Sequence, residues 1–154
     1  MPESTENIIR EQREGPSALA RLIDGVPEAE LRRVPGPGKW CVAALLAHLA
    51  EAELSASWRY RQMIERPGVE LAAFDQEDWA RRGRYDAWDP REAIEMFRLL
   101  REANLRVLSG LSPSEWESWG THVERGRTTV AELARHMLGH EGRHIEQIRR
   151  ILEG

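Results

Sequence analysis

The chain has 154 residues, of which 41% are hydrophobic and 31% are charged, and these proportions are typical of one globular domain covering residues 1–154. Its 26 acidic residues outnumber its 22 basic residues, so the net charge of -4 excludes the strongly basic surface that nucleic-acid binding requires. The longest apolar run, Val42 to Ala47, is far too short to cross a bilayer, and no membrane partner is expected.

Helical periodicity dominates the chain, and no segment alternates between apolar and polar residues for long enough to predict a strand. Pro16 suits the first turn of a helix over residues 16–24. An upstream extension of this helix is the other interpretation, with a break or kink where Gly15 precedes the proline. Residues 27–33 predict a short helical turn, and residues 34–38 predict a rigid connector.

A second long helix is predicted from Cys41 or Val42 to Glu65, because its apolar residues follow helical spacing. Residues 67–88 then form a long connection, with one helical turn around residues 76–82. Connections of this length in compact domains usually carry structure or cover a site. We therefore expect this segment to form part of a cleft.

The third long helix has clear start signals, with Asp89 as the N-cap and Pro90 at the first helical position. It is predicted to end at Ser109. Residues 112–119 predict a further short helical piece that includes Trp116 and Trp119.

The fourth long helix begins at a capping box formed by Thr129 and Glu132 and is predicted to run almost to Gly154. Four long helices with one long crossover predict an all-α four-helix bundle, with short extra helical turns in the connections.

His140 and His144 lie four residues apart within the apolar stripe of the fourth helix, so both project from its core face. His48 occupies the apolar face of the second helix in the same way, whereas Glu141 is expected to point away from the stripe. A buried imidazole needs a hydrogen bond or a ligand, and bundle cores are common metal sites. The spacing leaves two interpretations open: a three-histidine metal site, or hydrogen-bonded core histidines without a metal.

Two further residues are candidates for catalytic roles. Glu51, one turn after His48, can orient a ligand or act as a base, although an exposed helix glutamate is the competing interpretation. Gln147, one turn beyond the fourth-helix pair, can hydrogen-bond a ligand or substrate. His136, one turn before that pair, either lines the mouth of the site or lies on the helix surface.

His122 lies in the lead-in to the fourth helix, and we assign it no ligand role. Cys41 is the only cysteine, which excludes an intramolecular disulfide, and its place at the start of an apolar helix favours a small buried residue over a nucleophile. The residues after Met1 lack the basic and apolar regions of a secretory signal, so a cytoplasmic location is expected.

Two stretches of the chain resemble the DinB-like family. Residues 38–42, Gly-Lys-Trp-Cys-Val, and residues 46–53, Leu-Ala-His-Leu-Ala-Glu-Ala-Glu, are similar to the second-helix signature of that family. Residues 122–133 and the run His-Glu-Gly-Arg-His-Ile-Glu-Gln-Ile at residues 140–148 are similar to its last helix and lead-in. Together with helix order and length, the resemblance covers essentially the whole chain.

The resemblance implies an up-and-down-type bundle in which His48, His140 and His144 hold a divalent metal ion, nickel or zinc. Three imidazoles leave at least one coordination position open, as in catalytic sites. Characterised enzymes of this superfamily use low-molecular-weight thiols; they include thiol-dependent transferases and a maleylpyruvate isomerase. Several members form homodimers.

The implied function is therefore that of a metal-dependent thiol S-transferase or hydrolase acting on a small molecule, with a low-molecular-weight thiol as a candidate co-substrate. The alternative is a non-enzymatic, metal-stabilised binding or stress-response protein.

Overall fold

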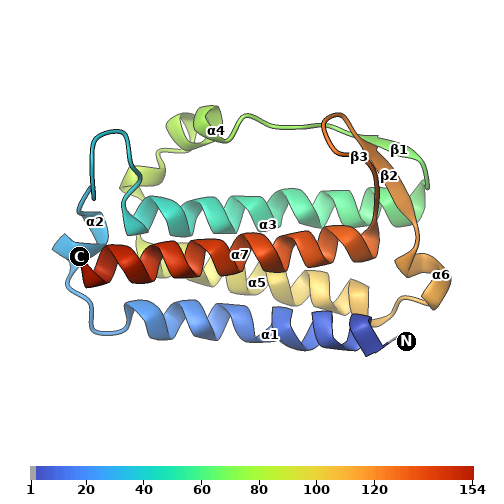
Figure 1. The fold of residues 1–154 in the computed structure, drawn as a ribbon, viewed down its shortest axis with the longest axis horizontal. Coiled ribbons are helices and arrows are strands. Elements are labelled where there is room, and N and C mark those ends of the chain that lie inside the picture. Colours follow the sequence, from blue (N-terminus) through green and yellow to red (C-terminus); the bar gives the residue numbers. More distant parts are fainter. Residues whose placement is uncertain (1–2) are drawn as a thin grey trace.

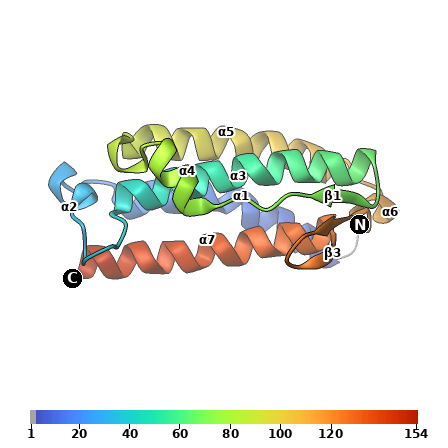
Figure 2. The same cartoon turned by 90° about the horizontal axis from the view of Figure 1, so that it is seen from above.

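The computed structural model describes residues 3–154 and shows a bundle of four long helices that lie alongside one another (Figure 1, Figure 2). In chain order these helices are α1 (Glu3–Ile23), α3 (Val42–Glu65), α5 (Pro90–Ser109) and α7 (Val130–Glu153). Helix α3 packs against α5 and α7, and α1 packs against the same two helices from the opposite side. The predicted all-α four-helix bundle is confirmed.

Shorter elements occupy the connections between the long helices. They are α2 (Glu28–Arg32), β1 (Val69–Leu71), α4 (Gln76–Arg82), the 3-10 turn η1 (Tyr85–Ala87), α6 (Pro113–Trp116), β2 (Trp119–His122) and β3 (Gly126–Thr129). The predicted helical turns at residues 27–33 and 76–82 are confirmed. The helical piece predicted for residues 112–119 ends at Trp116, and the prediction was wrong for Trp119, which begins a strand.

The capping residues start the helices where the sequence predicts. Asp89 accepts a hydrogen bond from the backbone N–H of Arg91, and Pro90 occupies the first turn of α5. Thr129 and Glu132 form a reciprocal capping box at the start of α7. The capping box fixes the residue at which α7 starts, and so the direction in which each side chain projects from this helix.

The prediction that the first helix starts at Pro16 was wrong, because α1 continues through this proline. The alternative, an upstream extension of the helix, is confirmed. A proline inside a helix has no N–H, so the carbonyl four residues earlier, on Gln12, loses its helical partner. Arg101 of α5 supplies the missing donor, since its Nη1 lies 2.7 Å from that carbonyl oxygen. The tertiary contact satisfies the backbone group that the sequence pattern leaves unpaired.

The expectation that the chain contains no strand was also wrong. Strand β1 pairs in parallel with β2, with Val69 opposite Gly120, and β2 pairs antiparallel with β3. Each strand has only three or four residues, too few for alternation to show in the sequence. Gly120 permits the sheet to lie close to α3, because a β-carbon there would meet Leu71 at 2.9 Å and Met63 at 3.0 Å.

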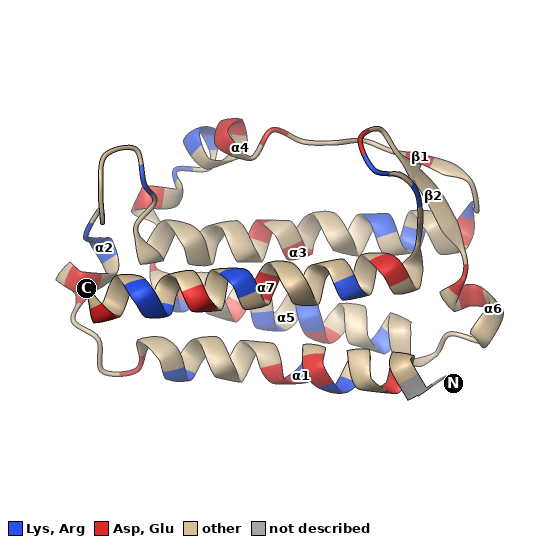
Figure 3. Ribbon diagram, viewed as in Figure 1, with Lys and Arg blue, Asp and Glu red and all other residues tan. Residues whose placement is uncertain are grey.

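Charged residues of both signs are interspersed along α1, α5 and α7 (Figure 3). Neighbouring pairs on one helix are common, as between Arg98 and Glu95 at 2.6 Å, and exposed pairs of this kind contribute little to stability. The stability of the bundle comes instead from apolar side chains buried between the helices, such as Leu45, Phe97 and Ile148. Within residues 3–154, no helix is long and apolar enough to span a bilayer.

A group of buried charged residues lies among these apolar side chains. Arg101 is 1% exposed and pairs with Glu53 at 3.1 Å and with Glu141 at 2.9 Å. The prediction that Glu141 points away from the core was therefore wrong. The position one residue after His140 lies at the edge of the apolar stripe, where a charged side chain becomes buried only because a partner on α5 neutralises it.

Candidate metal centre

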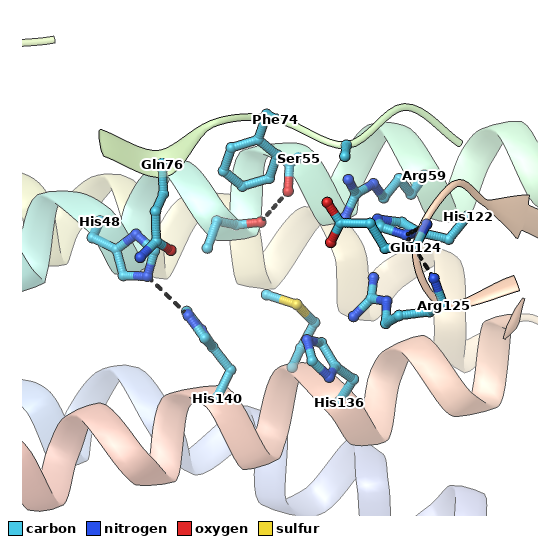
Figure 4. A pocket seen from close by; sticks show the side chains of 13 residues that line it. His48, Ser55, Arg59, Phe74, Gln76, His122, Glu124, Arg125, His136 and His140 are labelled. Carbon is cyan, nitrogen blue, oxygen red and sulfur yellow. Dashed lines mark hydrogen bonds between the residues drawn. The ribbon is translucent and has the colours of Figure 1, made fainter. Parts of the chain in front are cut away.

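Helices α3 and α7 bring three histidine rings together. His48 of α3 faces His140 and His144 of α7, and the ring centroids lie 4.6 to 4.9 Å apart. The Nε2 atoms of His48 and His140 are 2.9 Å from each other, as drawn in Figure 4. Each ring offers one ligand atom, and the three atoms lie within 4.8 Å of one another.

The position of the cluster follows from helix geometry. His140 and His144 are one turn apart on α7, so their rings project from the same face, and that face packs against α3. His48 is 3% exposed and lies in the apolar segment that begins α3. Two neighbouring helices therefore contribute all three rings.

Burial keeps the imidazoles neutral. It lowers the pKa of His48 to about 4 and that of His140 to about 3, with neighbouring histidines adding to both shifts. It also lowers the pKa of His144, although the hydrogen bond to Gln147 opposes that change. At neutral pH the rings are uncharged, which is the form that binds metal ions.

Gln147 lies against His144 of the histidine cluster, and its predicted role toward a ligand or substrate stays a prediction. Its Oε1 is 2.8 Å from Nδ1 of His144 and can accept a hydrogen bond from it. That bond places the ring proton on Nδ1 and leaves Nε2 of His144 with a free lone pair. Trp40 packs on the cluster from another side, with its ring centroid 5.3 Å from that of His48.

Glu51 is engaged elsewhere. Its carboxylate accepts a hydrogen bond of 2.6 Å from the hydroxyl of Tyr85, and burial, together with this contact, raises the pKa of that tyrosine. The structure thus joins Glu51 to the connection over α3 rather than to the histidine cluster. Its catalytic role stays a prediction.

The donor set fits a divalent metal ion. Two Nε2 atoms that face each other at 2.9 Å can share only one proton, so at least one lone pair points into the cluster. The ligand atoms of the three neutral imidazoles lie within reach of one point, and a metal ion at that point would accept their lone pairs. Within residues 3–154, this trio is the one group of histidine, cysteine or acidic side chains gathered closely enough to hold an ion.

A cavity of about 240 Å³ extends from the cluster along the groove between α3 and α7 (Figure 4). His48 and His140 line one end, and His136 and His122 line it farther along. His136 lines the cavity and is also exposed on the surface of α7, so the structure fits both of its interpretations. Cys41 is buried at the N-cap of α3, in agreement with its predicted structural role.

Arg59, Phe74, Glu124 and Arg125 also line this cavity, and the sequence analysis did not identify them. Arg125 and Glu124 lie on the loop between β2 and β3, a hairpin that was not predicted. No spacing motif connects these residues, because they come from segments that only the fold brings together. The alternation of the hairpin strands is too short to have revealed them.

The DinB superfamily model matches residues 12–148, which is most of the chain. The chain belongs to the DinB superfamily. Two relatives, each named "Putative metal-dependent hydrolase", come from Oceanobacillus iheyensis and Bacillus mycoides. The first is 25% identical over 85% of this DinB chain and 75% of its own length. The second is 22% identical over 98% of this chain and 87% of its own length.

Two solved structures share the DinB fold of this chain. YfiT from Bacillus subtilis, described as a probable metal-dependent hydrolase with an unusual four-helix bundle topology, has a TM-score of 0.91 at 16% identity and covers 98% of this chain and 87% of YfiT. A mycothiol-dependent maleylpyruvate isomerase has a TM-score of 0.73 at 15% identity, covering 96% of this chain and 61% of that one. At these identities the likeness shows the fold alone.

Proposed function

We propose that this protein is a metal-dependent enzyme that binds a divalent ion through His48, His140 and His144 and acts on a small molecule. The observation that carries the proposal is the convergence of three neutral imidazoles with ligand atoms within 4.8 Å of one another, two of which, His48 and His140, line an open cavity. A closed structural site has four protein ligands, whereas three leave a position for a reactant. Imidazole ligands suit both zinc and nickel.

The surrounding residues prepare the site for ligation. Gln147 accepts a hydrogen bond from Nδ1 of His144, which leaves Nε2 of that ring as the nitrogen available to a metal ion. Burial keeps His48 and His140 deprotonated at neutral pH. When bound, a divalent ion supplies Lewis acidity that lowers the pKa of a water or thiol reaching it and polarises a substrate oxygen.

Two reaction classes are compatible with this chemistry. Hydrolysis is supported by the names of the relatives and by the description of YfiT. Transfer of a low-molecular-weight thiol is the second candidate, supported by the shared fold with a mycothiol-dependent enzyme. Both need a nucleophile activated at the same three histidines.

Turnover assays separate these classes. Protein stripped with a chelator and reloaded with Zn²⁺ or Ni²⁺ is tested for ester hydrolysis and for thiol conjugation to monochlorobimane. We expect turnover in one assay, dependent on reloading and lost in His48→Ala, with folding verified by circular dichroism. Turnover that persists unchanged in His48→Ala contradicts the proposal.

A non-enzymatic, metal-stabilised protein is the alternative function. In that case metal removal lowers the melting temperature without any turnover in wild type across both assays. The cytoplasmic location and the homodimer stay predictions from the sequence and the family resemblance.

A further inference from the structure

The cavity beside the three histidines has a second end built from basic side chains. Arg59 of α3, His122 at the end of β2 and Arg125 of the following loop line it, and His136 of α7 lies next to the metal-site rings, with its ring centroid 6.5 Å from that of His140 (Figure 4). These residues come from three separate stretches of the chain, α3, the β2–β3 hairpin and α7, so no single helix face or capping motif explains why they gather here.

The two arginines of this basic end line the same cavity. Burial and the charge of Arg125 lower the pKa of Arg59. Among residues 3–154, neither guanidinium forms a salt bridge, and the Arg59 side chain donates one hydrogen bond, to the carbonyl of Ala72 at 2.7 Å. Most of their N–H donors therefore remain available to a ligand, and a bound anion would relieve the repulsion between the two cations.

His122 adds an oriented donor to the same end. Its Nδ1 accepts hydrogen bonds from the backbone N–H groups of Glu124, at 3.1 Å, and Arg125, at 3.3 Å. A neutral imidazole that accepts at Nδ1 carries its proton on Nε2, which is then a donor. The turn between β2 and β3 thus fixes Nδ1 of His122 by hydrogen bonds and leaves the Nε2–H group available as a donor to a ligand.

The charge balance of this end indicates a monoanion. Glu124 is the one carboxylate lining the cavity among the described residues, and it offsets one of the two guanidinium charges. A single positive charge remains, which matches one carboxylate better than a doubly charged phosphate.

We propose that the basic end is a subsite for the carboxylate group of a monoanionic small-molecule substrate. The inference rests on the proposed function, because it takes the three histidines as the place where the reaction occurs. Arg59 and Arg125 bind the carboxylate through the paired N–H donors that guanidinium groups offer to this planar group.

The subsite also sets the shape of the substrate. Arg59 follows His48 by eleven positions on one helix, which is about 16 Å along its axis. The carboxylate therefore lies well away from the reacting group. Phe74 lies between the two ends in Figure 4 and offers an apolar surface to the middle of the molecule. The substrate class is an elongated acid whose apolar body separates its carboxylate from its reactive group.

The subsite is tested first in the metal-free protein, so that the outcome does not depend on the metal. Butyrate, butyramide and inorganic phosphate are titrated while the arginine Nε–H resonances are followed by NMR. We expect butyrate to shift the Arg59 and Arg125 signals and to bind more tightly than the amide and phosphate.

Variants at the two arginines assign the site. Arg59→Gln and Arg125→Gln should each weaken butyrate binding about tenfold, and Arg125→Lys should retain part of it. Arg106→Gln is the control, because it removes one positive charge from α5, and no residue of α5 lines the cavity. This variant should leave butyrate binding unchanged. Equal binding of butyrate and butyramide, tighter binding of phosphate, or equal loss in Arg106→Gln overturns the proposal.

The second arm uses Ni²⁺-loaded protein and ω-mercaptoalkanoates of increasing length, compared with ω-mercaptoalkanols of the same length. Thiolate-to-metal absorption reports binding at the histidines. We expect the acids to bind about tenfold more tightly than the alcohols only at the longer lengths, and Arg59→Gln to abolish that difference.

The two arms separate two kinds of failure. Equal affinity of acids and alcohols at every length overturns the subsite and leaves the metal site standing. Absence of thiolate absorption with every probe rejects the proposed metal chemistry, while the butyrate titration still decides the subsite.

Discussion

Gly15 of α1 lies directly against the carboxylate of Glu141 on α7, since a β-carbon at residue 15 would come within 2.8 Å of the carboxyl carbon. That carboxylate pairs with Arg101 of α5, and the same guanidinium donates to the Gln12 carbonyl that Pro16 leaves free. The missing side chain at residue 15 therefore makes room for a charge network that joins α1, α5 and α7.

Gly15→Ala should destabilise the protein by about 1–3 kcal/mol, because the new methyl group displaces the buried carboxylate. This loss should exceed the gain in helix propensity that alanine brings. Gly142→Ala is the matched control, because nothing lies within 4 Å of its added carbon. Urea unfolding should show that Gly142→Ala is at least as stable as the wild-type protein. A Gly15→Ala variant that is more stable than wild type would contradict the packing of Gly15 against Glu141.

Arg101→Met should cost about 3–5 kcal/mol of unfolding free energy, because it leaves the carboxylates of Glu53 and Glu141 buried without a positive charge, although Glu53 keeps its hydrogen bond from Asn104. Arg98→Met on the same helix is the control, since its ion pair with Glu95 is exposed and its loss should change stability little. Denaturant titration of both variants measures the contrast. Equal stability of the two would show that the buried network contributes nothing.

The metal-free protein should lose stability as the pH falls below about 6.5, the pKa of an unfolded histidine. The pKa values of His48 and His140 in the folded state are about 4 and about 3, so over this interval the unfolded state binds more protons. Each histidine should contribute a slope approaching ~1.4 kcal/mol per pH unit until the pH reaches its folded pKa. The free energy of unfolding, measured across this pH range, should fall less steeply in His48→Gln than in wild type. A wild-type unfolding free energy that does not change with pH would contradict the burial of neutral rings.

Gln147→Leu should lower metal affinity about 10- to 100-fold, because it removes the acceptor that orients the His144 ring. Gln147→Glu keeps an acceptor for Nδ1–H and should retain most of the affinity. Competition with a chromogenic chelator measures both values. Unchanged affinity in the leucine variant would mean that the hydrogen bond does not orient the ligand.

The sequence predicted the long helices well because their signals are local. Asp89 and the Thr129 capping box mark helix starts, and apolar stripes identify the faces on which His48 and the α7 pair lie. The structure then brings those faces together. The metal-ligand role of the three histidines stays a prediction.

Failures occurred where distant residues decide the structure. The helix continues through Pro16 because Arg101, far along the chain, satisfies the free carbonyl, and Glu141 is buried for a similar reason. Strand β1 pairs with β2, which carries His122, across just over fifty positions, as Val69 with Gly120, and both strands are too short to recognise in the sequence. The cavity residues on the loop between β2 and β3, Glu124 and Arg125, were missed with these strands.

The most direct test of the account is calorimetric titration of Zn²⁺ and Ni²⁺ into untagged, metal-free protein and its single-histidine variants. We predict one bound ion per chain in wild type and in His136→Ala, and loss of that binding in His48→Ala, His140→Ala and His144→Ala. Wild-type protein that binds neither ion, or a His140→Ala variant that binds it as tightly as wild type, would contradict the three-histidine metal centre.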